Sequence, residues 1–192
     1  MGAHLTKGRV FDGSIMLSQH LLFFFAMLGA FNGIGLAAFL WWRAGGKPAL
    51  RWLSLLILAV GVRTGKSVAF HFWPDIPRIV LQFGLTACFM IGPCLFFLVR
   101  SCQSDTSGPS LLDRWHIAGL VILAIGVNVV LPYTGHPALW RHVITPGINY
   151  VWLGYLLLAS VQLYRHRTRL AGGSTGPMLL GALTGVWVIW MA

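Results

Sequence analysis

The sequence carries very little charge and almost no acid. Charged residues make up 9% of its 192 residues, glutamate is absent, and hydrophobic residues make up 57%. A soluble domain carries about 25% charged residues, so this chain cannot cover itself with a polar surface. The composition therefore excludes an ordinary soluble domain and predicts a polytopic membrane protein. The four acids are Asp12, Asp75, Asp105 and Asp113.

Cysteine is also scarce, and no motif groups catalytic or metal-binding residues. Three cysteines without a CxxC pair form neither a disulfide framework nor a zinc site. The chain has no HExxH motif, no intramembrane aspartate pair and no grouped Ser, His and Asp. None of the seven histidines is placed deep in an apolar run, where paired haem ligands would be needed. We therefore expect no metal, no cofactor and no enzymatic activity.

Long apolar runs, by contrast, follow one another along the chain. A helix that spans a bilayer needs about 20 apolar residues. Because backbone groups in hydrocarbon must be satisfied within each segment, these runs predict helices rather than open strands. The sequence thus predicts an all-α transmembrane helical bundle over 17–192, preceded by an extracytoplasmic tail at 1–16. The expected spans are 17–42, 50–73, 79–99, 115–133, 143–164 and 177–192.

The sixth run is shorter than the others. It extends for about 24 Å at the helical rise of 1.5 Å per residue, less than a hydrocarbon core about 30 Å thick. It also ends without a charged or polar flank. These features suggest the hypothesis that the chain is a fragment of a longer protein.

Lysine and arginine are unevenly divided between the two sides of the bundle. Eight of them fall in the first, third and fifth connections, and four fall in the N-terminal tail and the other connections. Since positively charged loops stay in the cytoplasm, the N-terminus is expected outside. The net charge of +10 is therefore a topology signal, and we expect no nucleic acid to bind this segment.

The stretch Gly61–Ser67, GVRTGKS, is spelled like a phosphate-binding loop. That loop has the form GxxxxGK[ST] and lies between a strand and a soluble helix. Counting back from Gly65, the position that requires the first glycine holds Val60. The flanking residues are apolar and predict a membrane helix, so the nucleotide-binding interpretation is rejected.

What remains in this stretch is two cations, Arg63 and Lys66, near the middle of the second span. Residues three apart share a helix face, and each such cation costs about 2.5–3.5 kcal/mol at the membrane centre. No Asp or Glu lies at membrane depth in another span, so the partner is an amide, a hydroxyl or a bound anion. Arg63, Lys66 and Gln82 are the candidate ligand-binding residues. A structural role, in which both cations snorkel or line a hydrated cavity, is the alternative.

Glycines recur four residues apart in three spans. Small residues at this spacing let helices approach closely, so they predict packing faces, and a homo-oligomer stays an open alternative. The pairs are Gly29 and Gly33, Gly61 and Gly65, and Gly181 and Gly185.

Several short motifs suggest a family. The second span holds GKS followed by aromatic residues, and the third holds Ile91-Gly92-Pro93 and leaves through Val99-Arg100-Ser101. With the opening AFNGIGLAAFLWWR and the exit YLLLASVQLYRHR, this pattern resembles the multi-helix N-terminal sensor region of bacterial membrane-bound AraC-type transcriptional regulators.

The resemblance implies a bundle of about seven helices in the bacterial inner membrane, followed by a cytoplasmic helix-turn-helix domain that this chain lacks. It implies a signal-sensing domain in contact with the lipid bilayer, and it carries over no ligand residues. One competing interpretation is a small anion transporter or channel subunit in which Arg63 and Lys66 bind the anion. Another is an inert or scaffold membrane protein.

Overall fold

The computed structural model describes residues 6–73, 75–103, 110–165 and 175–191, with side chains from residue 20 onward except Thr175. This described part is almost entirely helical and contains no strand, which confirms the predicted all-α bundle. A short α5 (Pro137–Leu139) and the π-helical turn η1 (Trp140–Ile144) lead directly into α6. The long helices are α1 (Thr6–Arg43), α2 (Pro48–Phe72), α3 (Arg78–Gln103), α4 (Leu111–Val130), α6 (Thr145–Arg165) and α8 (Thr175–Met191).

Five helical segments in the described part are long and apolar enough to cross a membrane, so the chain is a membrane-embedded bundle. The sixth apolar helix, Gly176–Met191, is shorter, as the sequence predicted. The predicted tail differs, because α1 is already helical from Thr6, whereas its apolar part begins only at His20. Residues 1–5 of the tail lie outside the described residues.

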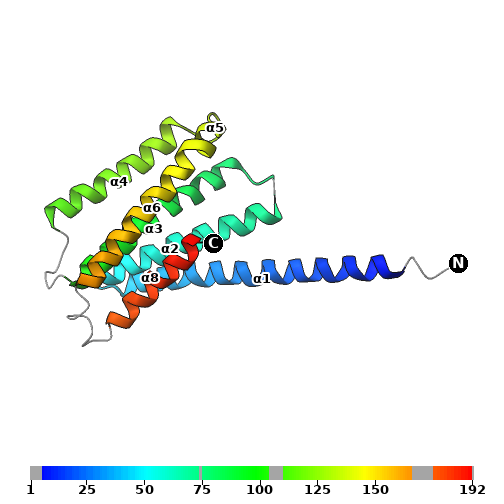
Figure 1. Cartoon of the computed structure of the whole chain (residues 1–192), viewed down its shortest axis with the longest axis horizontal. Helices are drawn as coiled ribbons and strands as arrows, with labels where there is room; N and C mark the ends of the chain where they lie inside the picture. The colour runs from blue at the N-terminus through cyan, green and yellow to red at the C-terminus, as the bar shows by residue number, and fades with distance from the viewer. Residues whose placement is uncertain (1–5, 74, 104–109, 166–174, 192) are drawn as a thin grey trace.

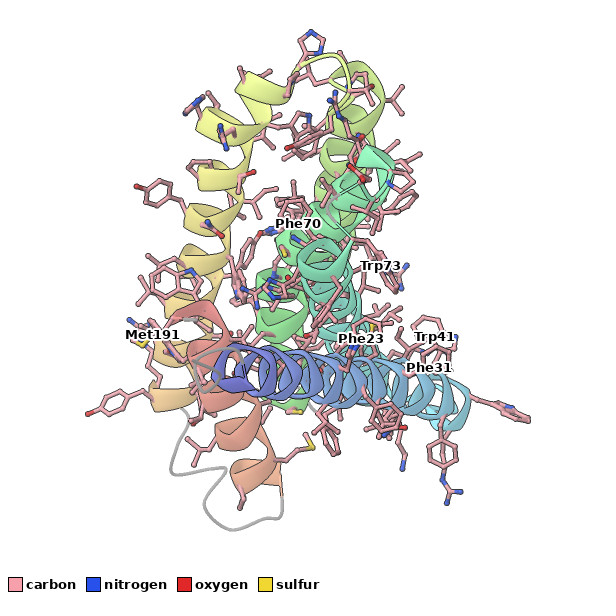
Figure 2. The ribbon with its side chains drawn as sticks, turned by 90° about the vertical axis from the view of Figure 1, so that its right-hand side faces the viewer. Phe23, Phe31, Trp41, Phe70, Trp73 and Met191 are labelled. Atoms are coloured by element: carbon pink, nitrogen blue, oxygen red, sulfur yellow. The ribbon has the colours of Figure 1, made fainter. Side chains whose placement is uncertain are left out.

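The central element is α3. It packs against α2 on one side and against α6 on the other, while α1 packs on α2 and α8 touches α3 and α6. Figure 2 looks along α1 and shows α3 between α6 and α2. In Figure 1 the N-terminal part of α1 extends beyond all the other helices. At one end of the α1–α2 pair, the Phe23 ring meets the rings of Phe72 and Trp73 edge-on, with centroids 4.8 and 5.3 Å away.

The core lies along α3 and α6. Leu95, Leu98 and Val99 of α3 are fully buried, together with Trp152 and Leu156 of α6. The IGP stretch is fully enclosed, and Pro93 lies inside the helix. The motif that suggested a family in the sequence is therefore part of the packing centre of the bundle.

Gly92 sets how closely α3 and α6 approach. A β-carbon built at this position would lie 3.1 Å from the Trp152 Cα, 3.2 Å from its carbonyl oxygen and 3.0 Å from the Tyr155 Cβ. Two of these atoms belong to backbone, which cannot rotate away as a side chain can. Any larger residue would therefore push the two helices apart.

The α4 helix is joined to α3 by several polar contacts. It packs only lightly on α3, and the Asp113 carboxylate at its N-terminus lies 3.2 Å from the Arg100 guanidinium of α3. Asp113 also forms a capping box with Ser110, which satisfies backbone donors of the first turn. Farther along, Asn128 donates a hydrogen bond of 2.8 Å to the Thr86 hydroxyl of α3.

Replacing Gly92 with alanine should destabilise the bundle by about 1–3 kcal/mol, the usual cost of overpacking. The matched control is Gly119→Ala on α4, where a β-carbon meets nothing within 4 Å. There the higher helix propensity of alanine should leave stability unchanged or slightly raised. Unfolding of the purified protein in detergent measures both, and equal effects at the two positions would contradict the close approach of α3 and α6.

Candidate intramembrane cation site

Arg63 and Lys66 lie on the face of α2 that is turned toward α3, and both side chains are half-buried. The midpoint of α2 is near residue 60, so at 1.5 Å per residue Arg63 is about 4.5 Å from it and Lys66 about 9 Å. Lys66 is thus less central than the sequence suggested. Both residues nevertheless fall within the half-thickness of a hydrocarbon core, about 15 Å, when α2 is centred in the membrane.

The Arg63 side chain connects three helices. Its guanidinium carbon lies 5.2 Å from the centroid of the Trp152 ring on α6, a cation–π distance. The guanidinium also lies near the Cys88 thiol on α3. Within the described ranges the backbones of α2 and α6 do not approach each other closely. The Arg63–Trp152 contact is therefore a direct side-chain link between these two helices.

The Lys66 side chain lies across Gly84 of α3. A β-carbon built at Gly84 would be 2.4 Å from the Lys66 Cδ, 2.5 Å from its Cγ and 2.8 Å from its Cβ. Only glycine can therefore accept the lysine stem in this position. The stem is covered by helix α3, and no hydrogen bond or ion pair holds the Lys66 ammonium among the described residues.

The site rests on a row of small residues in α3. Gly84, Cys88 and Gly92 follow one another at intervals of four, which places them on one helix face. Gly84 lies under Lys66, Cys88 lies near Arg63, and Gly92 admits the backbone of α6. The intramembrane cation site is hereafter Arg63, Lys66, Cys88 and Trp152, with Gly84 and Gly92 beneath it.

The site presents hydrogen-bond donors and no acid. Within the described ranges the ion pair that the structure records is Arg100 with Asp113, far along α3 from the two cations. The Trp152 indole N–H is buried without a hydrogen-bond partner. The described residues also contain no group of His, Cys, Asp or Glu that could hold a metal ion. The site is therefore suited to bind a negatively charged group or a strong hydrogen-bond acceptor, such as a carboxylate or phosphate oxygen.

Gln82, the third predicted ligand-binding residue, does not belong to this site. Its amide nitrogen donates to the Asn128 carbonyl at 2.8 Å, and its amide oxygen accepts from the Tyr133 backbone N–H at 3.3 Å. The structure does not bring it beside Arg63 and Lys66, because Gln82 and Gly84 are two residues apart, about 200° around the helix. Gln82 consequently faces α4, whereas Gly84 faces α2.

The glycine pairs divide into two groups. Gly33, Gly61 and Gly65 lie at the α1–α2 contact. A β-carbon built at Gly33 would lie 3.9 Å from the Gly61 Cα, and one built at Gly61 would lie 3.4 Å from the Ala30 carbonyl oxygen. The other three predicted packing glycines do not mediate a close approach, since a β-carbon there would meet nothing within 4 Å. These are Gly29, Gly181 and Gly185.

Together with Gly33 and Gly61, these three glycines line an apolar cavity of about 280 Å³ between α1, α2 and α8. The spacing of four was a correct signal that the glycines share a face. It could not reveal whether that face meets a helix or an open space.

Sequence reasoning missed Cys88, Trp152 and Gly84. For Gly84 and Cys88 a signal was present, because they continue to Gly92 at the same interval of four as the recognised pairs. Trp152 had no such signal. It is on a different span from Arg63, and only the packing of α6 on α3 brings the two side chains together.

Comparisons with known proteins add no relative. No protein family, no curated protein and no solved structure matches this chain.

The contact between Lys66 and Gly84 can be tested with a double-mutant cycle. Gly84→Ala should destabilise the wild-type chain because the new methyl group displaces the lysine stem. The same change should cost less in a Lys66→Ala background, where the Cγ and Cδ atoms are gone, with a coupling of about 0.5–3 kcal/mol. Unfolding free energies in detergent measure all four proteins. Strictly additive costs would show that the lysine stem does not lie on Gly84.

Proposed function

We propose that this chain is the membrane-embedded signal-sensing domain of a bacterial transcriptional regulator and that the intramembrane cation site receives the signal. The observation that carries the proposal is the pair of half-buried cations, Arg63 and Lys66, placed within the apolar length of α2. Neither forms an ion pair with a carboxylate of the described residues. Ionisable residues at membrane depth are expensive and by default indicate a functional site.

The position of the cations supports sensing in particular. Arg63 links α2 to α6 through the Trp152 ring and lies near Cys88 of α3. An anion that draws the guanidinium away from these partners would weaken the direct link between α2 and α6. A ligand shifts a conformational equilibrium only by its difference in affinity between two states, and a contact that an anion competes for supplies such a difference.

The regulator part of the proposal comes from the resemblance to AraC-type membrane regulators. It includes the bacterial inner membrane, an N-terminus on the outer side, and a cytoplasmic DNA-binding part beyond this sequence. The ligand expected on these grounds is a small anion or the acidic group of a larger molecule. Neither catalysis nor a cofactor is part of the proposed function.

Binding of anions tests the proposal directly. Purified protein in nanodiscs should be stabilised against thermal unfolding by at least one member of a panel of phosphate, sulfate and short carboxylates. Arg63→Gln and Lys66→Gln should each weaken that binding about 10- to 100-fold, because a hydrogen bond to a charged group contributes about 1.5–3 kcal/mol.

Arg141→Gln is the matched control for this experiment, because Arg141 is an exposed cation in η1, away from the site. It should bind the same anions as the wild-type chain. If Arg63→Gln and Lys66→Gln both fold properly and bind anions as tightly as the wild-type chain, the two cations have a purely structural role. That result would refute the proposal.

Anion flux separates sensing from transport. A sensing domain reconstituted into liposomes should leave the leak of chloride and phosphate at the level of protein-free vesicles. Flux that requires Arg63 and Lys66 would instead establish the competing function, an anion transporter or channel subunit that uses the same residues. A chloride electrode or a phosphate-binding dye measures the release of encapsulated ions from liposomes with and without the protein.

A further inference from the structure

A second feature, separate from the cation site, is the cleft between α3 and α4. It has a volume of about 590 Å³ and is lined by apolar side chains of both helices. Pockets that hold small ligands range from about 300 to 1,000 Å³. On the other side of the α3–α4 contact lies a smaller apolar cavity of about 200 Å³, so α4 has unfilled space on both flanks.

A polar bridge separates the two spaces. Thr86 and Asn128 line both of them, and their side chains are hydrogen-bonded to each other. Gln82, at the edge of the larger cleft, is satisfied through both ends of its amide. Because these polar groups already have hydrogen-bond partners, the interior of the cleft favours a hydrocarbon occupant over a polar one.

The depth of the cleft matches one leaflet of a bilayer. Its α3 lining runs from Ile79, at the start of the helix, to Met90. That distance is about 16 Å at 1.5 Å per residue, close to half of a hydrocarbon core about 30 Å thick. The cleft therefore reaches from the membrane surface at the α3 N-terminus to about the membrane centre.

The mouth of the cleft carries positive charge. Arg78, the first residue of α3, is exposed and directly precedes the lining residue Ile79. Thr134, from the connection after α4, lines the same end. An arginine at the membrane surface attracts an acidic lipid headgroup, with a contribution of about 1 kcal/mol.

We propose that the α3–α4 cleft binds one acyl chain of an anionic phospholipid from the surrounding bilayer, with its headgroup beside Arg78. The chain fills the apolar space from the mouth to Met90 and packs against the Thr86–Asn128 bridge. Since α4 packs only lightly on α3, the bound chain adds apolar contact along the cleft, where the two helices lie apart. This site is independent of Arg63 and Lys66.

Photo-crosslinking of the full chain in nanodiscs tests the proposal. The probe is phosphatidylglycerol with a diazirine in one acyl chain, and the labelled peptides are identified by mass spectrometry. Labelling should concentrate on the α3 residues 79–90 and the α4 residues 121–129, above the level on the exposed face of α1. Labelling spread evenly over all lipid-facing helices would overturn the proposal.

Two tryptophan substitutions, one residue apart, give a matched pair. Val121 lines the cleft, whereas Ile122 is 69% exposed and lines neither of the two cavities beside α4. Val121→Trp should lower labelling of α3 about tenfold, equivalent to about 1.4 kcal/mol, and Ile122→Trp should leave it unchanged. If Val121→Trp does not elute as a single species, Ala124→Leu fills the cleft with a smaller group. Equal labelling in the cleft-filling variant and the control would refute an occupant of this cleft.

The headgroup and the source of the chain are tested separately. Phosphatidylcholine with the same photoreactive chain should label the cleft about fivefold less than phosphatidylglycerol, and Arg78→Gln should remove this difference. Cleft labelling by a photoreactive free fatty acid but not by phospholipid would overturn the phospholipid assignment. A second copy of the chain would instead be the occupant if two results were found together. Native mass spectrometry would show a lipid-free dimer, and the Ile125→Cys variant would form a disulfide between copies.

Discussion

The close approach of α3 to its two neighbours is the constraint on which the rest of the bundle depends. Gly92 lets the α6 backbone come within van der Waals distance, and Gly84 provides the space that the Lys66 stem fills. Without hydrophobic drive between helices in a bilayer, such approaches stabilise a bundle through packing alone. The small face of α3 therefore determines the position of α2 and α6, and with it the position of both cations.

This arrangement determines the surroundings of the two cations. Arg63 lies against an aromatic ring and near a thiol, and Lys66 lies on a glycine. Among the described residues, polarizable and small groups therefore surround the two positive charges. A ring face attracts a cation more weakly than a carboxylate would. The guanidinium and ammonium thus keep the capacity to bind an anion, which is the physical basis for the proposed sensing function. The cleft beside α4 gives the same bundle a second, apolar point of contact with its membrane.

Particular residues show how far sequence reasoning reached. The helices, and the presence of two cations within an apolar span, followed from composition and from run length, and the structure agrees with both. Gln82 was grouped with the cations because its amide could partner them where no acid is present, yet its side chain is turned toward α4. Gly181 and Gly185 were expected to pack against a helix, yet they line a cavity. The spacing of residues and their depth in the membrane can be read from one helix. Which other helix packs against a given face cannot.

The sequence by itself determined that the chain forms apolar helices, roughly where each begins and ends, and which residues share a face. These properties are local, because they follow from hydrophobicity, from the need to satisfy backbone groups in lipid, and from the 3.6-residue period. Only the tertiary structure decided that Arg63 meets Trp152, that Lys66 lies on Gly84 and that α4 packs only lightly on α3. Those relations arise between segments distant in the chain, and the rotation of each helix about its axis is set by how its side chains interlock with its neighbours.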